Sequence, residues 1–164
     1  MRTLLLSMTL TAFAAGQGPD YDATALSAVV RQASFEFYNE LLYRDEPAWK
    51  GRVISFSGYM VDRPAIGKGK SPYIQLMGNG VNGLISVIAQ YDGKLPVKQV
   101  YGTDVPVVTT GQHLRFLAEI RTAENFLSVN GVWMYLPVVK LLAIYQQDDA
   151  ELKRALWVSR ELRR

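Results

Sequence analysis

The chain of 164 residues contains no cysteine and a single histidine, His113. The lack of cysteine excludes disulfide cross-links, thiolate zinc sites, iron–sulfur clusters and cysteine nucleophiles. It also excludes a lipid anchor joined through an N-terminal cysteine thioether. One histidine is too few for the usual imidazole metal site, which takes two or three. We therefore expect no metal and no cofactor, and a fold that is stabilised by packing alone.

The excess of positive over negative charge is small as well. The chain has 18 Lys+Arg and 15 Asp+Glu, a formal net charge of +3. So small an excess does not identify a polyanionic partner by itself. Hydrophobic residues make up 49% of the chain and charged residues 20%, which is typical of a globular protein. The length predicts one domain.

The N-terminus has the anatomy of a secretory signal peptide. Arg2 supplies a short positive region, residues 3–13 are apolar and uncharged, and Ala12-Phe13-Ala14 fits the small-x-small cleavage rule. The apolar stretch is shorter than the ~20 residues of a transmembrane helix. We expect cleavage near Ala14 and a periplasmic or secreted domain of residues 15–164, without a transmembrane anchor. The alternatives are an uncleaved anchor and a buried N-terminal helix.

Helical periodicity predicts a helix at each end of the mature chain. From Leu26 to Leu41 apolar residues recur every three or four positions, and residues 23–43 contain no glycine or proline. This pattern predicts a helix over 23–43 that ends before Pro47. A second helix is predicted over 149–163, because acidic residues precede it and arginines end it, as the helix dipole favours.

Between these helices the period changes to two, which predicts strands. The expected strands cover residues 52–62, 73–77, 84–91, 112–122 and 138–145. Their inward positions include Ile54 and Phe56 in the first strand and Leu114 and Phe116 in the fourth. The glycine- and proline-containing segment 92–110 is expected to be irregular. Five short strands must close or stack to remove their edges, so we predict a mainly β fold, a small five-stranded OB-like barrel over residues 52–146 with flanking helices.

Several segments resemble the tRNA-anticodon-binding-like OB domains of exported bacterial proteins. The resemblance covers roughly residues 35–146 and rests on Phe37-Tyr-Asn-Glu40, on Trp49-Lys-Gly-Arg-Val-Ile-Ser-Phe-Ser-Gly58, on the strand that opens with Gly111-Gln112, and on Leu141–Tyr145. Trp49 stands where that family usually has tyrosine. The loop after the first strand is long, and no helix is evident between the third and fourth strands. The resemblance implies the barrel and a binding module, but not tRNA binding, because a fold does not fix function.

The first candidate binding feature is a basic loop after the first strand. Arg63, Lys68 and Lys70 lie within eight positions, with glycines between them. In OB folds this loop flanks the ligand face, so three cations there could hold a phosphate or a polyanion. The spacing does not match a P-loop. The alternative is a solvated loop whose lysines only keep it soluble.

The second candidate is a set of outward-facing polar and aromatic strand residues. Its members are Tyr59, Tyr73, Gln75 and Gln90, with Ser86 between the last two. Tyrosine rings on an OB face can stack on bases, and the amides can contact a sugar or a peptide. The alternatives are ordinary cross-strand pairs, since tyrosine suits strands, or a surface that the N-terminal helix covers.

No catalytic constellation accompanies these features. His113 alternates with inward residues and is expected on the surface, and the chain has no Gly-x-Ser-x-Gly elbow. We therefore predict a non-enzymatic exported binding module of unknown ligand. One alternative is a single-stranded nucleic-acid or polyanion binder, and a second is a protein-interaction subunit of an envelope assembly.

Overall fold

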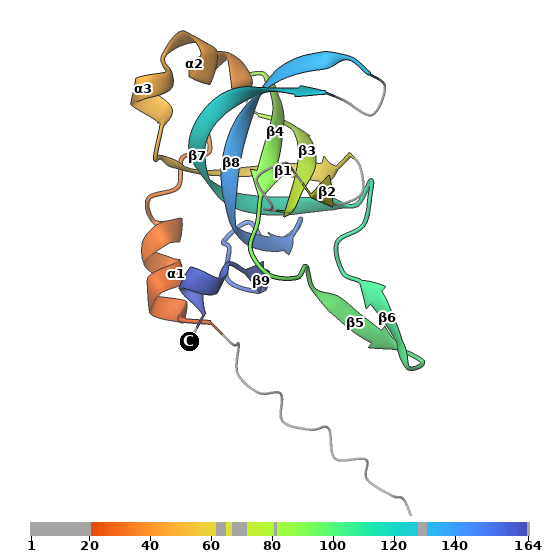
Figure 1. Cartoon of the computed structure of the whole chain (residues 1–164). Helices are drawn as coiled ribbons and strands as arrows, with labels where there is room; N and C mark the ends of the chain where they lie inside the picture. The colour runs from red at the N-terminus through yellow and green to blue at the C-terminus, as the bar shows by residue number, and fades with distance from the viewer. Residues whose placement is uncertain (1–20, 62–64, 67–71, 81, 128–130, 164) are drawn as a thin grey trace, which may run out of the picture.

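The computed structural model describes residues 21–61, 65–66, 72–80, 82–127 and 131–163, and its centre is a closed five-stranded barrel (Figure 1). The barrel strands are β1 (Val53–Met60), β3 (Pro72–Asn79), β4 (Leu84–Gln90), β7 (His113–Leu127) and β8 (Trp133–Gln146). They follow one another in the order β1-β7-β8-β4-β3, and a further β1–β3 pairing closes the ring. Only the β4–β8 pair is parallel among these. The predicted mainly β, OB-like barrel is confirmed.

Two glycines make the closing seam of the barrel. Gly58 of β1 lies opposite Gly78 of β3 in the antiparallel register. A Cβ on Gly58 would lie 2.2 Å from the carbonyl oxygen of Met77, and one on Gly78 would lie 2.1 Å from that of Ser57. No side chain fits at such distances, so the strands approach this closely because both positions lack one.

The interior of the barrel follows the predicted alternation. Ile54 and Phe56 of β1 are buried, as are Leu114 and Phe116 of β7. The rings of Phe56 and Phe116 pack with their centroids 5.5 Å apart. His113 is exposed, as its place in the alternation predicts.

The predicted single helix over 23–43 is wrong. The structure has α1 (Ala23–Val30), an extended segment, and two short helices, α2 (Asn39–Arg44) and α3 (Glu46–Trp49). The extended segment pairs with β1: the Ser34 amide donates to the Val53 carbonyl at 2.9 Å, and the Ser55 amide donates to the Ser34 carbonyl at 2.9 Å. A strand edge thus supplies the backbone bonds that a continuous helix would have made. Tertiary pairing here outweighs a helical hydrophobic pattern.

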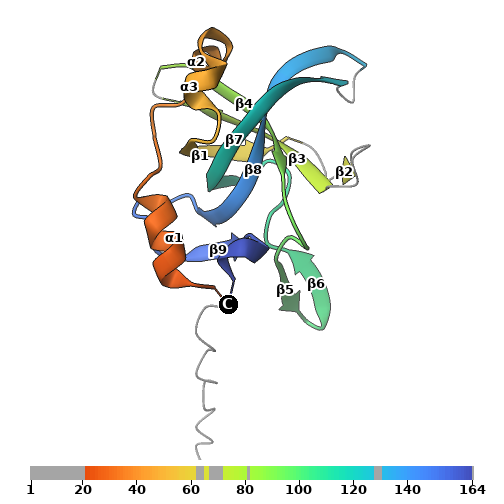
Figure 2. The same cartoon turned by 60° about the vertical axis from the view of Figure 1, so that its left-hand side comes forward.

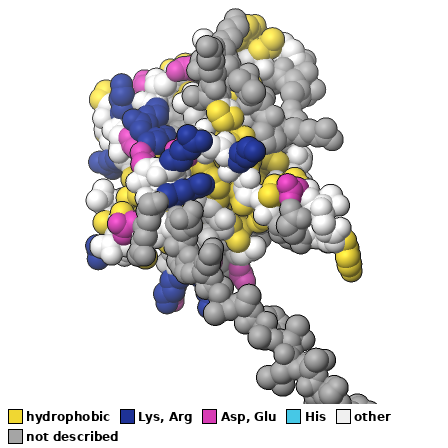
Figure 3. All heavy atoms as spheres, turned by 60° about the horizontal axis from the view of Figure 1, so that its bottom comes forward, with side chains coloured by type: hydrophobic (Ala, Val, Ile, Leu, Met, Phe, Trp, Pro, Cys, Tyr) yellow, Lys and Arg dark blue, Asp and Glu magenta, His cyan; other side chains and the backbone are white. Residues whose placement is uncertain are grey.

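Segment 92–110, expected to be irregular, contains a β-hairpin. β5 (Val97–Val100) and β6 (Thr103–Pro106) form a separate two-stranded sheet that projects from the barrel (Figures 1 and 2). Figure 3 shows hydrophobic side chains exposed toward this end of the molecule. The predicted loop after the first strand also holds a two-residue strand, β2 (Ala65–Ile66), which pairs with β3.

The predicted C-terminal helix over 149–163 is also wrong. β9 (Ala155–Val158) adds to β8, and a 3-10 turn follows over Arg160–Leu162. The Asp149 carboxylate accepts hydrogen bonds from the amides of Lys153 and Arg154, so it holds a turn rather than a first helical turn. β4 pairs with β8 only as far as Lys140, which leaves the rest of that edge for β9.

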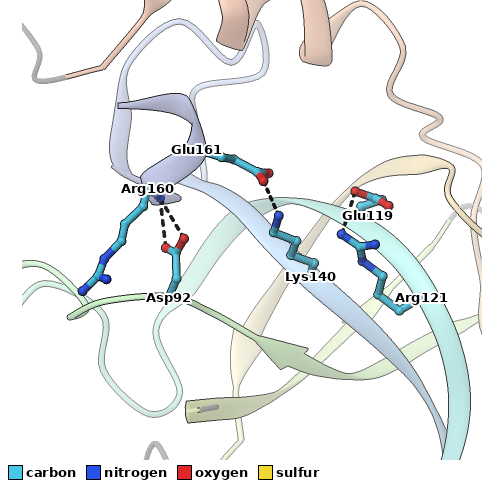
Figure 4. Close-up of polar contacts among 6 residues, drawn as sticks. All are labelled: Asp92, Glu119, Arg121, Lys140, Arg160 and Glu161. Atoms are coloured by element: carbon cyan, nitrogen blue, oxygen red, sulfur yellow. Dashed lines mark hydrogen bonds and ion pairs between the residues drawn. The ribbon is translucent and has the colours of Figure 1, made fainter. Parts of the chain in front are cut away.

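Polar contacts tie this C-terminal segment to the barrel (Figure 4). The Asp92 carboxylate accepts from the Arg160 amide at 2.9 and 3.0 Å, and Lys140 pairs with Glu161. A second apolar core lies outside the barrel, where α1 and the C-terminal segment cover β7 and β8. Its buried members include Leu26, Leu117, Leu142, Tyr145, Val158 and Leu162. No helix in the described ranges is long and apolar enough to cross a membrane.

Candidate ligand-binding groove

A groove of about 520 Å³ runs over the outer face of β3 and β4. It exists because β4 pairs with β8 only near Ile88, so the two strands separate toward Leu84 and Trp133. α2 forms one wall and the first residues of β8 form the other. We call this feature the β3–β4 groove; its lining includes Tyr38, Asn39, Glu40, Tyr43, Gln75, Met77, Leu84, Ser86, Met134 and Leu136.

Asn39 fixes the α2 wall to the sheet. Its carboxamide donates from Nδ2 to the Ser86 carbonyl at 2.9 Å and accepts at Oδ1 from the Ser86 amide at 3.0 Å. One side-chain amide therefore takes the place of a neighbouring strand's peptide group along this edge of β4. Without it, the backbone groups of Ser86 would face the groove with no bond.

Tyr43 connects α2 to the β8 wall. Its hydroxyl donates to the Tyr135 carbonyl at 2.8 Å and accepts from Asn39 Nδ2 at 3.3 Å. The two tyrosine rings lie with centroids 5.7 Å apart. Partial burial raises the pKa of Tyr43 above its ordinary value. The phenol therefore stays protonated and keeps donating at neutral pH.

The floor of the β3–β4 groove is mainly apolar with one polar group. Met77 and Leu84 lie beside Gln75, and Met134 and Leu136 face them from β8. No side chain or backbone group in the described part of the chain hydrogen-bonds the Gln75 carboxamide. This pattern, apolar walls with a few oriented polar groups, is usual in binding clefts.

The arm that β7 and β8 form beyond the barrel carries a second apolar surface, because alternation along β8 directs Trp133 and Tyr135 to the face opposite Met134 and Leu136. Leu127 lies opposite Trp133 in the ladder, and Asn125 lies opposite Tyr135. The side chains of Leu127, Trp133 and Tyr135 are 57%, 68% and 50% exposed. Large aromatic and aliphatic side chains on one exposed strand face are typical of interaction surfaces.

The structure brings some of the predicted site residues to this face and leaves others apart. Gln75 lies in the β3–β4 groove. Tyr59 lines an adjoining pocket of about 210 Å³ with His113, whose ring centroid is 5.2 Å from that of Tyr59. The pocket and the groove share Met77 and Leu84, so they form one surface.

The remaining predicted residues lie elsewhere. Tyr73 packs against Phe126 of the β7–β8 arm, with ring centroids 6.1 Å apart, and Gln90 is exposed opposite Tyr73 in the ladder. Ser86 is the exception: it lines the β3–β4 groove but is buried, with its backbone bonded to Asn39 of α2. The basic residues Arg63, Lys68 and Lys70 lie outside the described residues.

Sequence reasoning missed the two walls of the groove. The helix predicted over 23–43 includes Asn39 and Tyr43, and Met134 and Leu136 fall between the strands predicted over 112–122 and 138–145. A signal for β8 was present, because Trp133 to Pro137 alternates in size and polarity before the recognised apolar run. No comparable signal marks Asn39, since its role depends on the separation of β4 from β8.

Comparison with protein-family models, with curated proteins and with solved structures finds no match to this chain. The resemblance to exported anticodon-binding-like OB domains therefore stays a prediction. The barrel and the β3–β4 groove are therefore the features from which a function can be inferred.

Proposed function

We propose that this chain is an exported, non-enzymatic binding module, and that the β3–β4 groove takes an extended apolar segment of another protein. The observation that carries the proposal is the lining of the groove. Met77, Leu84, Met134 and Leu136 offer apolar contacts, and the Gln75 carboxamide offers a donor and an acceptor to a peptide backbone. Methionine-rich clefts adapt to varied apolar side chains.

The charge of the lining favours a protein segment over a nucleic acid. A groove for single strands follows the phosphates with lysines and arginines. The charged side chain among the described lining residues of this groove is Glu40, which would repel phosphates. The loop of Arg63, Lys68 and Lys70 stays the basis of the nucleic-acid alternative, in which that loop would supply the cations.

The exposed arm supports a macromolecular ligand rather than a small one. Trp133 and Tyr135 form a second exposed apolar surface on the β7–β8 arm, next to the groove wall that contains Tyr43. Tryptophan and tyrosine supply most of the affinity in many protein interfaces, because they bury large area at low entropic cost. The predicted signal peptide places such an interface in the envelope or outside the cell, which is consistent with a subunit of an envelope assembly.

The proposal is tested by titrating the ¹⁵N-labelled protein with eight-residue peptides that carry leucine, valine or phenylalanine at alternate positions. We expect shifts in the amide resonances of Gln75, Leu84 and Ser86, with affinity reduced at least tenfold by Leu84→Glu. Phe35→Glu is the matched control, because Phe35 and Leu84 are 48% and 52% exposed and Phe35 lies outside the groove.

Two results would decide against a peptide groove. Peptides that leave these resonances unmoved would overturn the proposal. Shifts produced instead by an oligothymidylate, and lost as salt rises, would support the nucleic-acid alternative, because phosphate contacts release counterions.

A further inference from the structure

The β5–β6 hairpin is a two-stranded sheet that stands away from the barrel (Figures 1 and 2). Among the described strands neither β5 nor β6 pairs with any other. Two-stranded sheets are marginally stable in water unless a further strand or a packed face supports them. The hairpin therefore presents surface that the rest of the described chain does not use.

Its turn places an aromatic residue in an unfavourable conformation at full exposure. Tyr101 and Gly102 have φ of 49° and 77°, the left-handed pair of a type I′ turn. Asparagine or aspartate followed by glycine is preferred there, because bulky side chains resist positive φ. The Tyr101 side chain is fully exposed, so no contact within the described chain offsets this cost. A strained, exposed aromatic residue points to a function outside the single chain.

The two edges of the hairpin differ in their capacity to add a strand. Val100 pairs with Thr103 across the turn, and the Val107 amide donates to the Pro96 carbonyl at 2.8 Å. Alternation along β5 then directs the backbone groups of Val97 and Gln99 outward. On β6 the outward positions are Asp104 and Pro106, and Pro106 has no N–H to donate. The β5 edge is thus the better suited of the two to pair with a further strand.

An apolar groove of about 600 Å³ lies at the base of the same hairpin. Its lining includes Met60, Tyr91, Leu95, Pro96, Val97 and Val108. We call it the hairpin-base groove. Three of these residues, 95 to 97, lead directly into β5, so the groove and the pairing edge are continuous.

We propose that the chain forms a symmetric dimer in which the β5 strands of two copies pair antiparallel and each Tyr101 enters the hairpin-base groove of the other copy. The register follows from symmetry. Pairing centred on Gln99 places Tyr101 opposite Val97 of the second copy, and pairing centred on Lys98 places it opposite Leu95. Both of these residues line the groove. A two-fold axis near the middle of β5 therefore places each Tyr101 at the hairpin-base groove of the other copy.

Such a dimer would account for the isolated sheet, the unpaired β5 edge and the exposed Tyr101 ring. It converts two isolated hairpins into a four-stranded sheet and bonds the outward backbone groups of Val97 and Gln99. It also buries Val97 and Val100, which are 54% and 36% exposed, together with the Tyr101 ring. The second copy is the occupant that the register favours, because pairing of β5 with itself brings Tyr101 opposite Val97 or Leu95, which line this groove.

The first test is sedimentation equilibrium of the purified protein and of Tyr101→Asn. Asn-Gly is a preferred type I′ turn, so this variant keeps the hairpin folded while it removes the ring. We expect a concentration-dependent dimer whose dissociation constant rises at least tenfold in the variant. Phe35→Asn is the control, because Phe35 is an exposed aromatic residue outside the hairpin and the hairpin-base groove, and it should leave the dimer unchanged.

The second test uses the absence of cysteine, which makes single-cysteine cross-linking unambiguous. Lys98→Cys and Gln99→Cys each sit at the centre of one of the two registers, so one of them should form a disulfide-linked dimer under mild oxidation. Asp104→Cys, opposite Gln99 on the other edge, should not.

The proposal is overturned if the protein stays monomeric up to several hundred micromolar, or if Tyr101→Asn dimerises as well as the parent. Cross-linking from position 104 that is as efficient as the better of positions 98 and 99 would also contradict it, since that indicates random collision rather than pairing through β5.

Discussion

Tyr145 shows how a single polar atom inside the second core weakens the fold. It is among the largest fully buried side chains, and its hydroxyl has no hydrogen-bond partner in the described part of the chain. Burial raises the pKa of Tyr145 well above its ordinary value, with smaller contributions from Tyr21 and Asp149. A buried hydroxyl without a partner costs about 1–3 kcal/mol.

Tyr145→Phe should therefore stabilise the protein by about 1 kcal/mol at pH 7. Because the folded-state pKa is raised, the folded protein disfavours the phenolate, so the parent loses stability as the pH rises above the ordinary tyrosine value of 10.0. The variant should lose stability less steeply between pH 9 and 11. Urea unfolding at several pH values measures both effects; a variant that is less stable at pH 7 would show that the hydroxyl is satisfied.

Phe116 is a contrasting case, because this wholly apolar side chain belongs to the core inside the barrel. It is fully buried and packs on Phe56. Phe116→Ala should lower the free energy of unfolding by about 3–5 kcal/mol, because it removes transfer free energy and leaves a cavity. Leu127→Ala, at an exposed position, should change it by less than about 0.5 kcal/mol. Similar losses for the two variants in urea unfolding would contradict the assignment of the core.

At the scale of elements, α2 is held in place by its tertiary contacts. The helix has six residues and no side-chain N-cap, so it depends on tertiary contacts rather than on its own propensity. Asn39 supplies two of those contacts, both with Ser86. The α2 wall of the β3–β4 groove therefore depends on a carboxamide that replaces a missing strand.

Asn39→Ala should cost about 2 kcal/mol, because it leaves both backbone groups of the buried Ser86 without partners. Hydrogen exchange at the Ser86 amide should become faster by at least tenfold. Glu40→Ala, at the next and exposed position of the same helix, is the control and should alter neither. Unchanged exchange in Asn39→Ala would mean that another group protects this edge of β4.

The β1–β3 seam is a second element-scale feature with a sharp test. Gly78→Ala would place a methyl group against the backbone of Ser57, where no side chain can move away. We expect a loss of at least about 3 kcal/mol, the upper range for overpacking, as the seam is forced apart. Ser57→Ala, the neighbouring substitution, should be close to neutral. A stable Gly78→Ala variant with the parent's circular dichroism would refute the close approach.

At the scale of the whole molecule, the proposed dimer and the proposed binding groove use separate surfaces. The β3–β4 groove and the β5 edge belong to different parts of the molecule. A dimer joined through β5 therefore leaves the β3–β4 groove of each copy open. Two such grooves on one particle would raise the apparent affinity for a partner that presents two copies of a segment.

The predicted processing gives a direct measurement at this scale. Cleavage near Ala14 removes the apolar leader and Arg2, which lowers the net charge by one. Mass spectrometry of the protein from an envelope fraction should find a chain that starts near Ala15. An intact Met1 in that fraction would contradict cleavage and support the uncleaved anchor.

The sequence by itself determined the barrel strands and their inward faces, because a period of two is a local property of β1, β3, β4 and β7. It also determined which chemistries are excluded, since no fold can supply a missing cysteine. The inward positions of Phe56 and Phe116 could be predicted for the same reason.

Only the tertiary structure decided how the remaining segments are used. Residues 31–38 and 155–158 leave the predicted helices because exposed edges of β1 and β8 offer them backbone partners. The walls of the β3–β4 groove exist because β4 and β8 diverge, which brings Asn39 to Ser86 across 47 positions. Pairings over such distances are not encoded in a local pattern, and it is these pairings that create the surfaces available for binding.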